Sequence, residues 1–211
     1  MAGFKAHLTG GVIAGAGFSA FGFHAKFLNP FQIVAVIIAG AFAGLLPDLD
    51  SDTGKPLSFI FHFISVLIPS LLFPHAAGIW GKSPEFVISW FSLSYILIRY
   101  VACAMIKKIT IHRGIMHSVP FAALAAGVGH ILFAPSGKYM ALLCAATIFS
   151  GCMVHLLMDE FNSFSLKFGF IPVLKRSIGT ALKLKSDSPG ATLLIYLLLV
   201  AVYAIVILYY W

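Results

Sequence analysis

The sequence predicts an all-α fold, a polytopic transmembrane bundle of about six to seven membrane helices with short loops. Of its 211 residues, 60% are hydrophobic and only 10% are charged, whereas about a quarter of a soluble domain is charged. The mean hydropathy is +0.98. The apolar residues gather in runs close to the roughly 20 residues that a spanning helix needs. We therefore expect residues 1–211 to form a single integral membrane domain.

Seven apolar runs mark the expected helices. In chain order they are Ala6–Phe23, Phe31–Leu46, Leu57–Phe73, Phe86–Ile106, Val119–Phe133, Tyr139–Met158 and Ala191–Tyr210. The first run is short and lacks a convincing cleavage site, so we expect a retained helix rather than a signal peptide. A re-entrant or interfacial helix is the alternative to a spanning one. Gly11 and Gly15, like Gly40 and Gly44, have the spacing that lets membrane helices pack closely.

Residues 161–189 form the one long connection between these runs. Phenylalanines are mixed there with Lys167 and Lys175, which suits chain lying in the headgroup layer. Gly169 and Pro172 would interrupt a long helix. We expect an interfacial cytoplasmic loop, and a simple basic connector is the alternative.

The basic residues divide unequally between the two membrane faces when the runs are threaded in order. Most of the 14 lysines and arginines fall on the face of the N-terminus, which the positive-inside rule makes cytoplasmic. The formal charge of +7 also suits contact with anionic headgroups. Because no basic stripe on a soluble module is present, we expect no nucleic-acid partner. The sequence leaves protein partners open.

Acids and histidines gather at this same face. Of the seven acids only Glu85 falls on the other face, and acids have too little influence on topology for orientation to explain this. A site on the cytoplasmic side would explain it. The groups concerned are His7, Asp48, Asp50, His112, His117, His155 and Asp159. We expect His24, His75 and His130 to be interfacial or packing histidines. His62 is expected to be a buried, hydrogen-bonded core histidine, and a residue that contacts the metal ligands is the alternative.

Two segments present acids at suggestive spacings. Asp159 follows His155 by four residues, so both project from one helix face; a self-satisfied hydrogen-bonded pair is the alternative. Asp48 and Asp50 point to the same side if the chain is locally extended, and a solvated turn is the alternative.

Residues 111–118 place His112, Arg113 and His117 between two apolar runs, where ionisable groups mark a functional site. The Arg113 guanidinium matches phosphate geometry, with interfacial snorkelling as the alternative. We expect Ser118 to be a helix N-cap, and a serine nucleophile is the lesser alternative.

Imidazole and carboxylate ligands suit a divalent metal, zinc first and manganese or iron as alternatives. The three cysteines all lie inside apolar runs, so thiolates are not expected as ligands. Seven candidate groups exceed the needs of one tetrahedral ion, so either two ions bind or some groups act as bases. We expect the metal ligands to be His7, Asp48, His117, His155 and Asp159. His112 and Asp50 would be ligand or base, and Arg113 would bind a substrate phosphate.

These elements occur together in an order that resembles a known family. His7 with its glycines, Pro-Asp-Leu-Asp at 47–50, His-Arg-Gly with His-Ser at 112–118, and His155 with Asp159 are similar to the bacterial inner-membrane, LexA-linked, YdjM-like group. The resemblance extends from His7 to about Pro172. Met116 and Glu160 depart from the family pattern. The matching positions are His7, Asp48, Asp50, His112, Arg113, His117, Ser118, His155 and Asp159.

The resemblance implies a membrane-bound, metal-dependent hydrolase of the bacterial inner membrane, phospholipase-like in the sense that a phospholipid would be its substrate. Membrane lipid would then be both environment and substrate, with the site on the cytoplasmic side. Two other functions are alternatives. An ion- or proton-conducting transporter subunit would need polar groups continuing through the bilayer. A non-catalytic scaffold would use the metal only to staple helices together.

Overall fold

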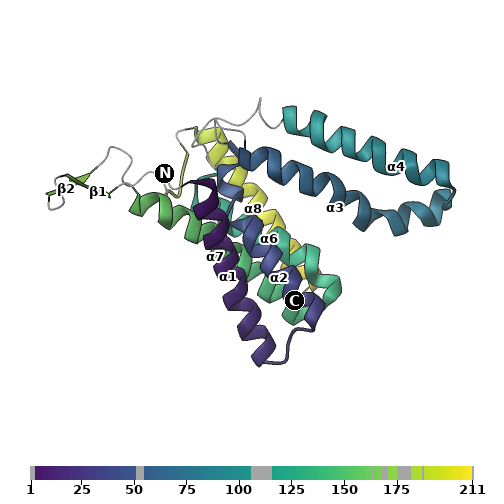
Figure 1. The fold of residues 1–211 in the computed structure, drawn as a ribbon, viewed down its shortest axis with the longest axis horizontal. Coiled ribbons are helices and arrows are strands. Elements are labelled where there is room, and N and C mark those ends of the chain that lie inside the picture. The colour runs from purple at the N-terminus through teal and green to yellow at the C-terminus, as the bar shows by residue number, and fades with distance from the viewer. Residues whose placement is uncertain are drawn as a thin grey trace. The chain divides into compact units, whose positions relative to one another are not determined.

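A computed structural model describes residues 3–50, 55–105, 116–162, 164–167, 171–174, 182–186 and 188–210. Helices dominate these residues, which confirms the all-α fold class (Figure 1). The chain divides into two compact units, Met1–Asp48 with Arg113–Trp211 and Leu49–His112, and each is described by itself. The single integral membrane domain stays a prediction.

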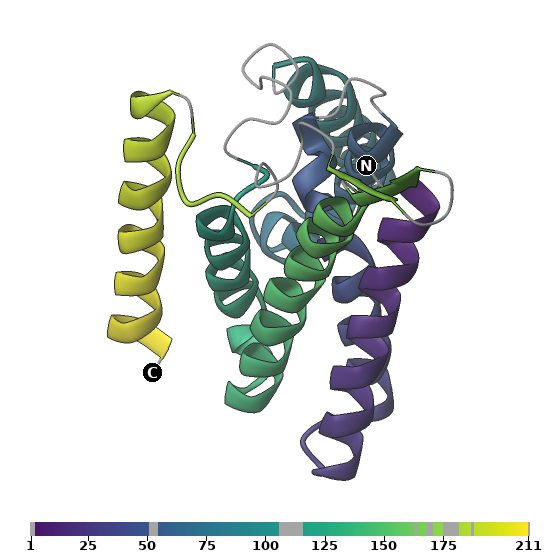
Figure 2. The same cartoon turned by 90° about the vertical axis from the view of Figure 1, so that its left-hand side faces the viewer.

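The first unit is a set of helices packed side by side. Its elements are α1 (Phe4–His24), α2 (Pro30–Ala43), α6 (Val119–Phe133), the 3-10 turn η3 (Ala134–Ser136), α7 (Lys138–Phe161) and α8 (Pro189–Tyr210). The 3-10 turn η1 (Leu46–Asp50) follows α2. Helix α7 contacts α1, α2 and α6, and α8 contacts α6 (Figure 2). Helix α7 is therefore the centre of this unit.

A short hairpin follows α7. Its antiparallel strands are β1 (Phe164–Lys167) and β2 (Ile171–Leu174), with Phe164 opposite Leu174. The hairpin lies inside the segment for which the sequence predicts an interfacial loop. Its location at the membrane interface stays a prediction.

The second unit is a helical hairpin. It consists of α3 (Lys55–Trp80) and α4 (Pro84–Ile96), and α4 continues into the π-helical segment η2 (Leu97–Ala102). At one end of the hairpin, Leu57 and Phe61 of α3 pack against Cys103, which directly follows η2. Near the other end, Trp90 Nε1 donates a hydrogen bond of 3.0 Å to the carbonyl oxygen of Pro69.

All seven apolar runs form helices in the described part of the chain. Five of these helices are long and apolar enough to cross a membrane, which supports a multi-pass membrane protein. Helix α2 is shorter, and α1 is not among the five. A membrane-spanning role for α1, and the side on which the N-terminus lies, stay predictions.

Glycines allow α1, α2 and α7 to approach at backbone distance. A Cβ atom at Gly11 would collide with the carbonyl oxygen of Gly40, and one at Gly44 would collide with that of His7. A Cβ atom at Gly151 of α7 would lie 3.1 Å from the same Gly40 oxygen. The predicted close packing is confirmed. It brings the first turn of α1, which carries His7, against the end of α2.

We expect replacement of Gly11 by alanine to lower the free energy of unfolding by about 1–3 kcal/mol, because the new methyl group must push two backbones apart. Chemical unfolding in mixed detergent micelles measures this change. Gly17 of the same helix is the matched control, since a methyl group added there would have no atom within 4 Å. Alanine at position 17 should leave stability unchanged or raise it by up to about 1 kcal/mol. Equal losses in both variants would contradict the packing role.

Candidate metal centre

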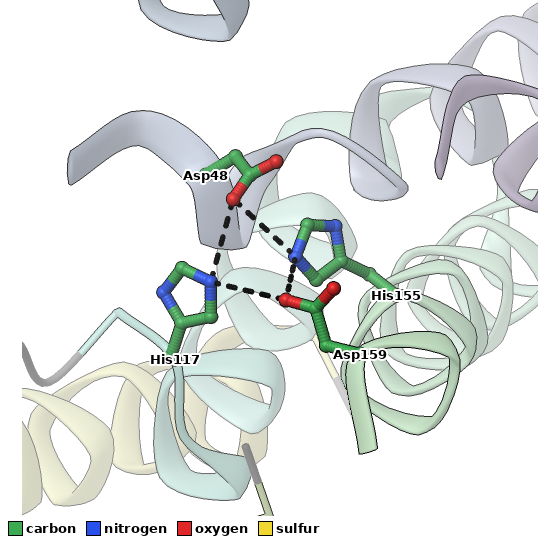
Figure 3. Close-up of side chains that lie close together, drawn as sticks. All are labelled: Asp48, His117, His155 and Asp159. Atoms are coloured by element: carbon green, nitrogen blue, oxygen red, sulfur yellow. Dashed lines mark ion pairs between the residues drawn. The ribbon is translucent and has the colours of Figure 1, made fainter. Parts of the chain in front are cut away.

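Four side chains from three segments of the first unit converge on one point (Figure 3). Asp48 comes from η1, His117 from the turn before α6, and His155 and Asp159 from α7. One ligand atom from each side chain lies within 4.8 Å of the other three. All four residues are buried, and Asp48 is the most accessible at 8% exposure. We call them the four-residue group.

The distances within this group suit a tetrahedral ion. The Nε2 atom of His117 lies 3.4 Å from Asp48 Oδ1 and 3.9 Å from Asp159 Oδ2. The Nε2 atom of His155 lies 3.6 and 3.8 Å from the same two oxygens. Ligands held at about 2.1 Å from one tetrahedral ion lie roughly 3.4 Å apart. The four observed separations equal this spacing or exceed it slightly.

The orientation of His155 is set by the end of α2. Its Nδ1 atom lies 2.8 Å from the carbonyl oxygen of Gly44. A carbonyl oxygen only accepts hydrogen bonds, so Nδ1 carries the hydrogen, and Nε2 of the neutral ring presents a lone pair. Metal-binding histidines are commonly oriented by such a contact.

The buried Nε2 atom of His155 forms no hydrogen bond with any described residue. Its lone pair instead faces one carboxylate oxygen of Asp48 and one of Asp159. A lone pair opposite two anionic oxygens is repulsive unless a cation lies between them. The chemistry of this donor set therefore fits a bound metal ion.

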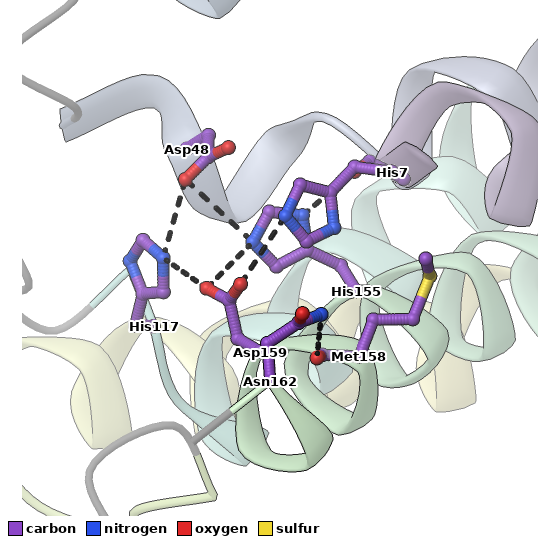
Figure 4. Close-up of polar contacts among 8 residues, drawn as sticks. His7, Asp48, His117, His155, Met158, Asp159 and Asn162 are labelled. Atoms are coloured by element: carbon purple, nitrogen blue, oxygen red, sulfur yellow. Dashed lines mark hydrogen bonds and ion pairs between the residues drawn. The ribbon is translucent and has the colours of Figure 1, made fainter. Parts of the chain in front are cut away.

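His7 lies beside the four-residue group rather than within it (Figure 4). Its ring stacks on that of His155 with the centroids 3.7 Å apart. Its Nε2 atom lies 3.3 Å from Oδ1 of Asp159, the oxygen that does not face His117 and His155. This contact suits a role of His7 in orienting Asp159. A role of His7 as a metal ligand stays a prediction.

Asp48 is held as a carboxylate by its neighbours. Burial raises the pKa of this carboxyl group. A hydrogen bond from the adjacent imidazole of His117 is the largest effect that lowers this pKa, and the net pKa lies below the usual value. The ionised form is the one that binds a cation.

The helical spacing of His155 and Asp159 is confirmed, since both side chains enter the group from one face of α7 (Figure 3). Asp48 and Asp50 belong to a 3-10 turn. The extended segment that would point both carboxylates to the same side is therefore wrong, and the turn that was its alternative is present. Asp48 is also buried rather than solvated. The side chain of Asp50 lies outside the described part of the chain.

Ser118 is the N-cap of α6, as the sequence predicts. Its Oγ atom accepts a hydrogen bond of 3.3 Å from the backbone N–H of Phe121. This cap fixes the start of α6 directly after His117. A nucleophilic Ser118 stays a prediction, and the predicted His112 and Arg113 lie outside the described residues.

The other histidines have different surroundings. His24 and His75 are exposed, and His130 is buried among α6, α7 and α8. The prediction of a buried core position for His62 is wrong, because its side chain is exposed and its Nδ1 atom lies 2.9 Å from the hydroxyl of Tyr95. Sequence reasoning missed the Gly44 carbonyl, for which only the glycine spacing gives a signal.

We expect replacement of Ser118 by alanine to lower the stability by about 1 kcal/mol through loss of the cap, and to weaken metal binding because His117 is adjacent. Thermal unfolding and metal titration measure the two effects. Ser83 is the matched control, because it caps α4 with the same 3.3 Å bond, to Phe86. Ser83→Ala should lower stability alone. Equal weakening of metal binding in both variants would contradict a local role for Ser118.

Comparison with known proteins supports the conclusion that the chain is a membrane protein. A family model described as YdjM inner membrane protein matches residues 1–211. No curated protein and no solved structure matches the chain significantly. The family match includes all members of the four-residue group.

Proposed function

The chain belongs to the YdjM inner membrane protein family, and we propose that it is a membrane-bound, metal-dependent hydrolase. The observation that supports this proposal is the buried four-residue group, in which two imidazoles face two carboxylates at 3.4–3.9 Å. In the hydrophobic part of a helical bundle, placing these four ionisable side chains together is costly unless they bind a shared cation.

We assign the four-residue group to one divalent ion. Two imidazoles and two carboxylates at near-tetrahedral spacing suit zinc, and manganese and iron are the alternatives. The three cysteines are buried and free, and none belongs to the group. Metal binding would therefore use nitrogen and oxygen ligands alone.

A divalent ion bound by these four side chains would supply Lewis acidity, and a water of lowered pKa would be a fifth ligand. The chain's own residues would orient the site. The Gly44 carbonyl holds His155, and His7 holds Asp159. The Asp48 side chain keeps 12% of its surface exposed while that of His155 keeps none, so a substrate would approach from the side of Asp48. The base roles of Asp50 and His112, and the phosphate contact of Arg113, stay predictions.

A phosphoester in a lipid or other amphiphile is the substrate class that we propose. An apolar groove of about 680 Å³ runs between α1 and α7, the two helices that carry His7, His155 and Asp159. Gly10 and Met158 line it, and Lys5 lies at its edge. Met158 directly precedes Asp159 in the chain. An acyl chain in this groove would bring its headgroup close to the metal centre.

We expect the purified protein to retain about one zinc or manganese ion per chain, and His155→Ala and Asp159→Ala to lower metal affinity by at least about 100-fold. Elemental analysis after dialysis measures the retained metal. His24→Ala, which removes an exposed histidine from α1, is the control and should retain the ion. Unchanged metal content in all three variants would exclude the four-residue group as the site.

Metal binding without catalysis would favour the second candidate function, a scaffold in which the ion only holds helices together. The low exposure of all four residues also fits this function. Vesicles that contain a radiolabelled phospholipid separate the two functions. We expect metal-loaded protein to release the headgroup or its phosphate into the water and to leave phosphatidate or diacylglycerol in the vesicle, and His155→Ala to release none. A protein that binds the ion and unfolds without it, but cleaves no phosphoester, would be a scaffold. The transporter alternative stays a prediction.

A further inference from the structure

Arg99 lies within one of the two apolar spans of the second unit. The segments Leu57–Trp80 and Pro84–Met105 are both long and apolar enough to cross a membrane. Arg99 is their one basic residue and Glu85 their one acid. Fourteen residues of helix, roughly 21 Å at 1.5 Å per residue, separate the two side chains. Glu85 therefore does not neutralise Arg99.

The guanidinium of Arg99 lies near one end of the hairpin. Its Nη2 atom donates a hydrogen bond of 2.9 Å to Oγ of Ser58, at the start of α3. Its Nη1 atom lies 3.9 Å from Sγ of Cys103, close to the end of the other span. Both contacts place the charge at the depth where a spanning hairpin meets the headgroup layer.

Among the described residues, no acidic side chain compensates the charge of Arg99. The side chain is half-buried, and its buried Nε atom has no hydrogen-bond partner in the described part of the chain. The contacts on its terminal nitrogens are a hydroxyl and a thiol, and its Cζ atom lies 5.5 Å from the ring of Tyr100. No carboxylate among the described residues pairs with it. An arginine stays charged in proteins, and a partly buried charge without a counter-ion is costly.

We infer that Arg99 and Ser58 form a phosphate-binding site at this end of the α3–α4 hairpin, occupied by the headgroup phosphate of a membrane phospholipid. Each terminal nitrogen has a second N–H, and the planar fork of guanidinium matches two phosphate oxygens. Arg99 belongs to the π-helical turn η2, a distortion that is frequent at functional sites. The site lies in the second unit and does not depend on the proposed hydrolase activity.

Delipidated full-length protein in a maltoside detergent tests this site by native mass spectrometry. Dioleoylphosphatidylglycerol is titrated into the wild type, Arg99→Gln and Lys82→Gln. Lys82 is exposed and lies just before α4, at the other end of the hairpin, so its replacement removes the same charge. We expect Arg99→Gln to weaken binding of this lipid by at least about tenfold, and Lys82→Gln to leave it unchanged. Dioleoylglycerol, which has the same chains without phosphate, should bind weakly to all three.

Two further measurements identify the occupant and guard against misfolding. Inorganic phosphate at millimolar concentration should not displace the lipid; complete displacement would overturn the lipid headgroup as the occupant.

The Arg99→Lys variant keeps the charge but loses the planar guanidinium, and Ser58→Ala removes the hydroxyl. Both variants should fold and bind the lipid more weakly than the wild type. Equal lipid binding by the wild type and by all folded Arg99 and Ser58 variants would overturn the site, as expected if a carboxylate outside the described residues is the counter-ion.

Discussion

The candidate centre depends on how one imidazole is held. The Gly44 carbonyl accepts a hydrogen bond from Nδ1 of His155. The lone pair on the opposite nitrogen, Nε2, then faces Asp48 and Asp159. In a buried site of low dielectric, this arrangement is unfavourable without a positive charge between the groups. The same contact also joins the end of α2 to the middle helix of the first unit. The positions of the candidate ligands therefore depend on how these helices pack.

Close helix packing makes this arrangement possible. Gly11 and Gly40 allow the backbones of α1 and α2 to touch, and Gly44 accepts the first turn of α1 at van der Waals distance. Larger residues at these positions would move the carbonyl away from His155 and His7 away from Asp159. The glycines thus affect the candidate metal centre through helix packing, and the Gly44 oxygen also contacts His155 directly.

Periodicity predicted the parts of the structure that depend on local chain geometry. The seven helices follow from apolar runs, and the shared face of His155 and Asp159 follows from 3.6 residues per turn. The 3-10 turn at Asp48 was not predictable in this way, because two acids two residues apart suit an extended chain equally well. The place of His7 beside Asp159, and the role of the Gly44 carbonyl, come from tertiary packing between segments far apart in sequence. A backbone oxygen has no residue type that a sequence pattern would reveal.

X-ray absorption spectroscopy of the purified, metal-replete protein tests the central claim most directly, because it reports the atoms bound to the ion. Four or five nitrogen or oxygen ligands at about 2.0–2.2 Å, with the outer-shell scattering of two imidazoles and no sulfur, are the predicted result; the fifth ligand would be the water that a hydrolase needs. A sulfur shell at about 2.3 Å, or an ion surrounded only by water oxygens, would contradict binding by Asp48, His117, His155 and Asp159.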